Sequence, residues 1–170
     1  MRRVTLISTG GTIEKTYDEA SGALSNRASI VPRMLRRLRL EETQVNSVQL
    51  MHKDSLDLTD DDRRRIVEAV RLHADGAERG DGVVVLHGTD TLCETGDLLA
   101  RELSAIKIPV ILTGAMRPYE MARSDALQNL TEAILASGVV EAGVYVAAHG
   151  RVMRFPGVKK DRVRGTFVPV

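Results

Sequence analysis

Short apolar runs alternate with longer amphipathic segments along this chain. The runs lie at residues 4–7, 45–51, 83–86, 110–112 and 144–148. Short runs rich in Val, Ile and Leu are typical of strands that are buried on both faces of a sheet. Because helical patterns separate these runs, the sequence predicts an α/β fold. We expect a doubly wound, mostly parallel sheet with helices on both faces, in a three-layer, Rossmann-like arrangement.

Three segments have the spacing of amphipathic helices. The clearest follows Thr59, whose hydroxyl can cap the first turn, and begins with three aspartates at the positive end of the helix dipole. We expect this helix to end near Gly76 or Gly80. Two further helices are expected from residue 92 towards residue 106 and from residue 124 towards residue 136.

Two segments near the N-terminus have other patterns. Residues 14–29 lack apolar periodicity and are rich in turn-forming residues, so we expect a long mobile loop. A loop of this length beside a reaction site is typical of a lid, and an idle connection is the alternative. Residues 33–40 interleave arginines with Leu and Met, which predicts one amphipathic helix with its charged face in water.

Length and charge narrow the class of protein. The 170 residues match one ordinary domain, and no repeat or linker divides them, so a single domain over residues 1–170 is expected. The net charge of +1 creates no overall field for nucleic acid or an acidic membrane, and we expect neither partner. The first apolar run is too short for a signal peptide or a membrane span, so we expect a cytoplasmic protein.

Several common kinds of site are not indicated. Cys93 is the only cysteine, which excludes a disulfide within the chain, and we interpret it as a small buried hydrophobe. The four histidines show no metal-ligand spacing, so no metal is expected. Two of them, His87 and His149, lie at predicted strand ends and are interpreted as hydrogen-bonded structural residues. Neither a phosphate-binding glycine motif nor a G-x-S-x-G motif is present.

Two hydroxyl-rich turns carry the candidate chemistry. Thr12 comes shortly after the first apolar run, behind a pair of glycines, and Thr89 and Asp90 come after the run at residues 83–86. Ligands of open parallel sheets bind beyond the carboxyl ends of the strands, where both turns are expected. A threonine nucleophile needs a base, and Thr89 can relay a proton while Asp90 holds a cation. A partly buried lysine can serve as the base, and Lys107, Lys159 and Lys160 are the lysines available for this role. The alternative for either turn is that its hydroxyls only cap backbone groups.

Three motifs and two shorter elements allow a comparison with known enzymes. They are Thr9-Gly10-Gly11-Thr12-Ile13, His87-Gly88-Thr89-Asp90-Thr91, Leu112-Thr113-Gly114-Ala115-Met116-Arg117-Pro118, Ser124-Asp125 with Asn129-Leu130, and Lys160 after Val158-Lys159. In this order and spacing they closely resemble the bacterial-type L-asparaginases. The resemblance spans nearly the whole chain and corresponds to the family's N-terminal domain, so we expect the family's C-terminal domain to be absent.

The resemblance implies hydrolysis of L-asparagine to L-aspartate and ammonia, without a metal or an organic cofactor. Thr12 would attack the side-chain amide and form an acyl-enzyme, which water would then hydrolyse. Thr89, Asp90 and Lys160 would handle protons. Tyr17, the only tyrosine of the expected loop, would assist Thr12.

The resemblance also implies how a substrate is held. Ser55 would bind the α-carboxylate and Asp90 would face the α-ammonium, while the backbone around Thr89 and Ala115 would line the amide pocket. The expected substrate-binding set is Gly11, Ser55, Gly88, Thr89, Asp90 and Ala115. Two alternatives stay open: an amidase acting on glutamine or on a larger carrier, and a non-catalytic amino-acid sensor. We expect a homodimer or a larger homo-oligomer, because exposed sheet edges often pair.

Overall fold

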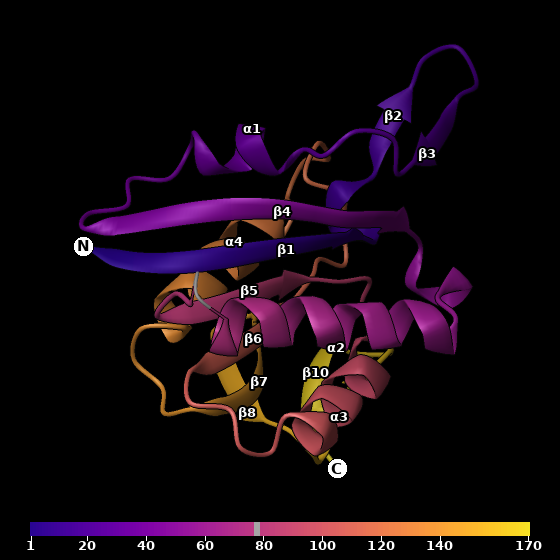
Figure 1. Cartoon of the computed structure of the whole chain (residues 1–170). Coiled ribbons are helices and arrows are strands. Elements are labelled where there is room, and N and C mark those ends of the chain that lie inside the picture. The colour runs from indigo at the N-terminus through magenta and orange to yellow at the C-terminus, as the bar shows by residue number, and fades with distance from the viewer. Residues whose placement is uncertain (77–78) are drawn as a thin grey trace.

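The computed structural model of the chain describes residues 1–76 and 79–170. Six strands form its central sheet: β1 (Arg2–Gly10), β4 (Thr43–Lys53), β5 (Gly82–Leu86), β6 (Pro109–Thr113), β7 (Gly143–Ala148) and β8 (Arg151–Arg154). They are arranged in the order β4-β1-β5-β6-β7-β8, and only β8 runs antiparallel to its neighbour (Figure 1). Each of the five predicted apolar runs lies in one of the parallel strands, so the predicted sheet is confirmed.

Helices cover both faces of the sheet. They are α1 (Val31–Leu35), α2 (Asp60–Asp75), α3 (Leu92–Glu102) and α4 (Ala126–Ala136). α2 and α3 pack on one face, and α1 and α4 pack on the other (Figure 1). Successive residues of β5 pack alternately on the two faces. Val85 packs in the core beneath α2 and α3, and Val84 packs in the core beneath α1 and α4. The predicted doubly wound, three-layer fold is therefore confirmed.

The order of the strands reverses between β1 and β5. The chain passes from β1 outward to the edge strand β4, and then crosses back to place β5 on the other side of β1. Ser8 of β1 is in register with Leu86 of β5, so the two strands end at the same level. Open α/β sheets bind ligands at such a switch point, and both candidate turns leave the sheet here.

The helix boundaries agree with the sequence in part. α2 begins after Thr59, whose side chain accepts a hydrogen bond from the Asp62 nitrogen, and ends at Asp75 as expected. α3 ends at Glu102, short of residue 106, because the chain leaves helical geometry at Leu103. α4 begins two residues later than expected, since the Ser124 hydroxyl accepts from the Ala126 nitrogen and lies outside the helix.

The helix expected over residues 33–40 is wrong. α1 ends at Leu35, and the chain continues through turns and irregular residues to β4. Val31 and Met34 are the residues of α1 that are buried in the core. Leu38 packs against the same core but lies outside the helix. Tertiary packing thus overrides the amphipathic pattern. The arginines of this segment are exposed, as the sequence predicted.

The segment of residues 14–29, expected as a loop without regular elements, contains a β-hairpin. Its strands are β2 (Thr16–Asp18) and β3 (Ala23–Ser25), and it projects away from the sheet (Figure 1). The Asp18 carboxylate accepts hydrogen bonds from the Ala20 nitrogen and the Ser21 hydroxyl, and so builds the turn.

A second hairpin, formed by β9 (Val158–Asp161) and β10 (Thr166–Pro169), lies at the C-terminal end of the sequence. Phe167 and Val158 are buried in the core on the α2 and α3 side, so this hairpin is fixed to the sheet. Within the described ranges, we find no helix with the length and apolar character needed to cross a membrane.

Candidate active site

The turns after β1 and β5 touch through two glycines. Gly11 has φ 78°, and a Cβ atom on it would lie 2.4 Å from the Gly88 nitrogen and 2.5 Å from the Gly88 Cα. Only glycine permits both this backbone conformation and this approach. The Thr9 hydroxyl also joins the two turns by donating to the Leu86 carbonyl at 2.8 Å. Thr12 and Thr89, which directly follow the two glycines, are therefore carried by adjoining turns.

The turn after β4 lies against the same place. Ser55 begins a short 3-10 helix, Ser55–Asp57, and a Cβ atom on Gly88 would lie 2.6 Å from the Ser55 hydroxyl oxygen. Thr91 fixes this turn by donating to the Ser55 carbonyl at 2.9 Å. The Ser55 hydroxyl itself is buried and has no hydrogen-bond partner among the described residues. A buried polar atom without a partner is uncommon in a folded protein, so this hydroxyl has capacity for a ligand.

A lysine from the second hairpin reaches the turn after β5. Lys160 Nζ donates to Thr89 Oγ1 at 2.7 Å and to Asp90 Oδ1 at 3.0 Å. Thr89 is 5% exposed and the Lys160 side chain is 15% exposed, so water screens these contacts only weakly. The predicted group of Thr89, Asp90 and Lys160 therefore lies together, although about 70 residues of chain separate the lysine from its partners.

The turn that carries Thr12 is held by a carboxylate that the sequence analysis missed. Glu14 is 1% exposed and accepts hydrogen bonds from the Ser8 hydroxyl, the Gly10 nitrogen and the Ser29 hydroxyl. Thr12 is half-buried, and its hydroxyl makes no hydrogen bond with the residues that the structure describes. Glu14 thus fixes the turn while the Thr12 hydroxyl stays free.

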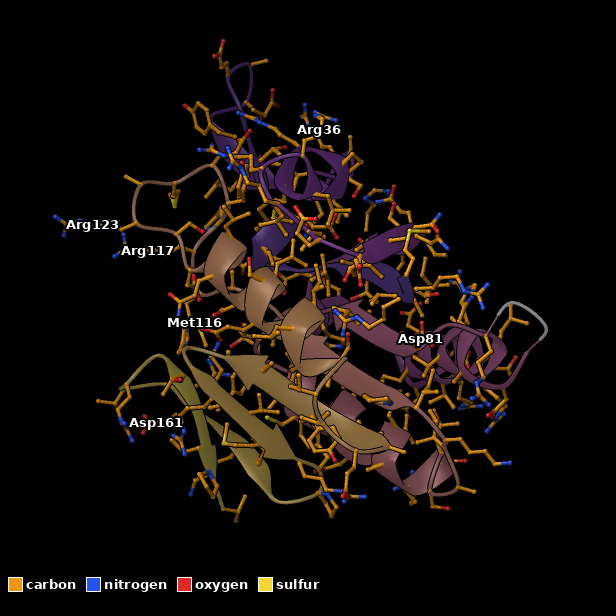
Figure 2. The ribbon with its side chains drawn as sticks, turned by 90° about the vertical axis from the view of Figure 1, so that its left-hand side faces the viewer. Arg36, Asp81, Met116, Arg117, Arg123 and Asp161 are labelled. Carbon is orange, nitrogen blue, oxygen red and sulfur yellow. The ribbon has the colours of Figure 1, made fainter. Side chains whose placement is uncertain are left out.

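The turn after β6 forms a further side of the site. Ala115 is buried in the core on the α4 side. The residues on both sides of it are held by side chains at the start of α4. Asp125 accepts from the Met116 nitrogen at 2.9 Å, and Asn129 Nδ2 donates to the Gly114 carbonyl at 2.9 Å. Further along, Arg117 and Arg123 point outward (Figure 2).

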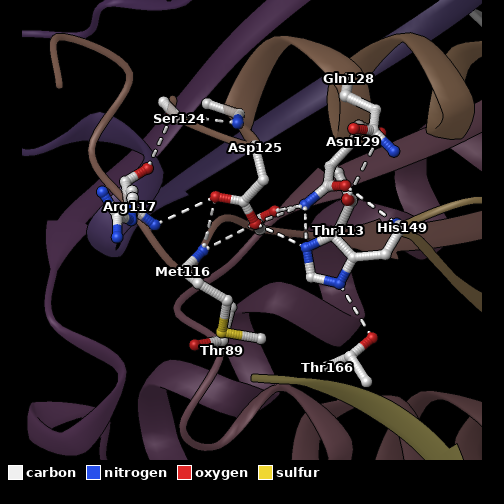
Figure 3. A network of polar contacts seen from close by, with 12 residues as sticks. Thr89, Thr113, Met116, Arg117, Ser124, Asp125, Gln128, Asn129, His149 and Thr166 are labelled. Carbon is white, nitrogen blue, oxygen red and sulfur yellow. Dashed lines mark hydrogen bonds and ion pairs between the residues drawn. The ribbon is translucent and has the colours of Figure 1, made fainter. Parts of the chain in front are cut away.

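His149 connects this turn to the C-terminal hairpin. Its Nε2 lies 2.7 Å from Asp125 Oδ2, and its Nδ1 lies 2.8 Å from the Thr166 hydroxyl (Figure 3). Burial raises the pKa of Asp125, but hydrogen bonds from the Met116 nitrogen and from His149 outweigh burial and leave the pKa below its usual range. The network links the turn after β6 to the hairpin that carries Lys160, which agrees with the structural role expected for His149.

The surroundings of His87 and Cys93 indicate structural roles for both residues. His87 is fully buried, with Nδ1 2.8 Å from the Gly88 carbonyl and Nε2 2.8 Å from the Thr95 hydroxyl. Burial lowers the pKa of His87 to about 4, so its ring is neutral at pH 7. Burial, together with the charge of Asp97, raises the pKa of Cys93 to about 11, which agrees with an unreactive thiol. Cys93 is half-buried, however, and not fully buried as the sequence predicted.

Tyr17 lies apart from these groups. It is 59% exposed in the β2–β3 hairpin, and its hydroxyl is 4.0 Å from where a Cβ atom of Gly22 would lie, at the hairpin turn. Arg162, which the sequence analysis did not consider, lies nearer: its Nη1 is 2.8 Å from Asp90 Oδ1. The available signal was its position two residues after Lys160. Within the described ranges, no cluster of three or more His, Cys, Asp or Glu side chains is arranged to hold a metal.

Comparisons with known proteins agree on one family. The family model described as "Asparaginase, N-terminal" matches residues 3–166. L-asparaginase 1 of Escherichia coli K12 is 37% identical over 131 residues, which cover 74% of this chain and 37% of that protein. A component of the glutamyl-tRNA(Gln) amidotransferase of Thermoplasma acidophilum is 32% identical over 150 residues, which cover 87% of this chain and 36% of that protein.

A solved structure shows the same similarity in three dimensions. The thermostable L-asparaginase from Thermococcus kodakarensis aligns with a TM-score of 0.87 at 28% sequence identity. This alignment covers 99% of the present chain and 51% of that one. The chain therefore spans between about a third and a half of the length of these relatives.

The contact between Gly11 and Gly88 predicts an unequal response to alanine. Gly11→Ala should reduce the free energy of unfolding by about 3 kcal/mol or more, because backbone strain adds to a clash with Gly88. Gly22→Ala is the matched control, since Gly22 also has positive φ but a Cβ atom there would meet only the Tyr17 hydroxyl, at an ordinary contact distance of 4.0 Å. It should cost only about 1 kcal/mol. Denaturant unfolding measures both values, and equal losses would show that the contact with Gly88 is unimportant.

The buried His87 predicts a loss of stability in mild acid. Its folded-state pKa of about 4 lies below the ordinary value of 6.5, so the unfolded chain takes up the proton first as the pH falls. The contribution of the neutral His87 ring to the free energy of unfolding is therefore fully present above pH 6.5. It is lost progressively as the pH falls from 6.5 towards 4. His87→Gln should reduce the drop in unfolding free energy between pH 7 and pH 4 by about 3 kcal/mol. The exposed His52, changed to Gln, is the control for removal of one histidine, and an equal reduction of the drop in both variants would contradict the prediction.

Proposed function

The chain belongs to the asparaginase family, and on that premise we propose that it hydrolyses L-asparagine to L-aspartate and ammonia with Thr12 as the nucleophile. The observation that best supports this reaction is the 2.7 Å contact between Lys160 Nζ and the Thr89 hydroxyl. An ammonium group at this distance stabilises negative charge on the threonine oxygen, and so helps it to exchange a proton with a neighbouring group.

In the proposed acylation step, the Thr12 oxygen forms a bond to the amide carbon of the substrate. The proton of Thr12 passes through the Thr89 and Lys160 group to the leaving nitrogen, and the carbon–nitrogen bond breaks to release ammonia. A water molecule then attacks the resulting ester. Its proton returns to the Thr12 oxygen, and L-aspartate leaves. Protons balance over the two steps, and the chain's own side chains carry them.

The groups around Thr89 suit the two ends of the amino acid. The unpartnered Ser55 hydroxyl can donate to the α-carboxylate, and Asp90 can accept from the α-ammonium once the Arg162 guanidinium, 2.8 Å from Asp90 Oδ1, is displaced. Gly11, Gly88 and Ala115 would form the backbone walls of the pocket. Tyr17 would take part when the β2–β3 hairpin moves toward Thr12, because a tyrosine closing over the turn would exclude water from the acyl-enzyme.

A second candidate function is amide hydrolysis on glutamine or on a larger carrier. This second function is favoured by the similarity of the chain to a component of the glutamyl-tRNA(Gln) amidotransferase, which is 32% identical over 150 residues. Relative turnover of L-asparagine and L-glutamine decides between the two functions. Release of many ammonia molecules per protein molecule from either amide would exclude a non-catalytic sensor.

Removing either hydroxyl or the lysine charge should abolish most of the proposed activity. Thr12→Ala, Thr89→Ala and Lys160→Met are each expected to lower kcat for ammonia release from L-asparagine at least about 100-fold. Thr12→Ser keeps a hydroxyl and is the matched control, which should retain measurable turnover. Wild-type rates in any of the first three variants would remove that residue from the mechanism, provided that circular dichroism shows an intact fold.

Self-association through a sheet edge is part of the same proposal. β4 is a long edge strand, and residues 44–50 carry no charged or proline residue that would oppose pairing with another strand. We expect a homodimer or a larger assembly in sedimentation at micromolar concentration. Val48→Lys in the middle of β4 should shift it to the monomer, whereas a wild-type monomer would contradict the proposal.

A further inference from the structure

Two cations approach the same oxygen of Asp90. Lys160 Nζ lies 3.0 Å from Oδ1, and Arg162 Nη1 lies 2.8 Å from that oxygen. The lysine side chain is 15% exposed, whereas the arginine side chain is 69% exposed. Lys160 is therefore the inner partner of Asp90, and Arg162 covers the carboxylate from the solvent side.

The turn of the β9–β10 hairpin positions Arg162. Asp161 Oδ1 accepts hydrogen bonds from the Val163 and Arg164 nitrogens, both at 3.0 Å. These bonds fold the chain tightly around Arg162, and Gly165 completes the turn with φ 60°. The backbone that carries the guanidinium is thus fixed beside Asp90, although the end of the side chain is exposed.

The local charge has a consequence for the substrate. Asp90 contributes one negative charge, whereas Lys160 and Arg162 together contribute two positive charges. The formal charges of these three side chains therefore sum to +1. A substrate ammonium approaching Asp90 would meet two like charges and would have to displace the guanidinium. A substrate that brings only a carboxylate would meet a favourable field.

We propose that Arg162 is a specificity-determining residue that takes the place of a substrate α-ammonium beside Asp90. The preferred substrates are then monoamides of dicarboxylic acids that carry no free α-ammonium, and L-asparagine is hydrolysed less efficiently. This inference rests on the proposed function of the site. The Ser55 hydroxyl remains available to the single carboxylate of such a substrate.

Two amides that differ only at the α-carbon test the proposal. Succinamate is L-asparagine without the ammonium, so the ratio of their kcat/KM values isolates that group. We expect wild-type protein to hydrolyse succinamate at least as efficiently as L-asparagine. Arg162→Gln should shift the ratio about tenfold towards L-asparagine, mainly through KM, because a competing charge is removed.

Two control variants separate the guanidinium contact from general charge. Arg164→Gln removes the same charge from the same turn, and no contact between the Arg164 side chain and Asp90 is found among the described residues. It should change the ratio less than about twofold, since exposed charges act weakly at a distance. Arg162→Lys keeps the charge and should retain most of the preference. Equal shifts in Arg162→Gln and Arg164→Gln would overturn the proposal.

Product binding gives a readout that does not depend on turnover. Calorimetry should show that Arg162→Gln raises the affinity for L-aspartate relative to succinate by about tenfold, as for the amides. If no variant releases ammonia but this affinity ratio shifts, the proposed hydrolysis fails, whereas the placement of Arg162 in the ammonium position beside Asp90 is supported. If the ratio is unchanged, or if neither product binds, the inference is overturned.

Discussion

The close approach of two glycine backbones, where β1 and β5 leave the sheet, determines the geometry of the candidate site. Gly11 and Gly88 touch at a point where no Cβ atom fits, and Ser55 packs against the other side of Gly88. The strand register places both turns at the same level. Since Thr12 and Thr89 each follow one of these glycines, the contact also brings their two turns together. The parallel sheet places the two turns at the same edge, and the lack of side chains on Gly11 and Gly88 lets the turns approach closely.

The positive charge on which the proposed reaction depends comes from elsewhere in the chain. Lys160 reaches Thr89 from the C-terminal hairpin, which is fixed to the core by Phe167 and to the turn after β6 through His149. A threonine hydroxyl is a weak acid in water, so a poorly screened ammonium 2.7 Å away alters its chemistry more than any neighbouring neutral group does. The fold and the proposed reaction therefore depend on the same hairpin.

Most of the sheet could be predicted from the sequence, because continuous apolar runs report burial on both faces of a strand. The end of α2 and the site group of Thr89, Asp90 and Lys160 were also predictable, the latter through resemblance to a family. The β2–β3 hairpin was missed because local bonds to Asp18 create it without an apolar pattern. Glu14 and Arg162 were missed for another reason. Their roles arise from contacts with Ser29 and Asp90, and composition and periodicity carry no information on such contacts.

The proposed reaction requires Thr12 to be the residue that becomes acylated. Mass spectrometry of protein quenched in acid during turnover of an amide substrate, followed by peptide mapping, measures this step directly. The proposed mechanism predicts an added acyl group on the peptide that contains Thr12, and its absence in the Thr12→Ala variant. An acyl group on the peptide that contains Thr89, with none on Thr12, would contradict it.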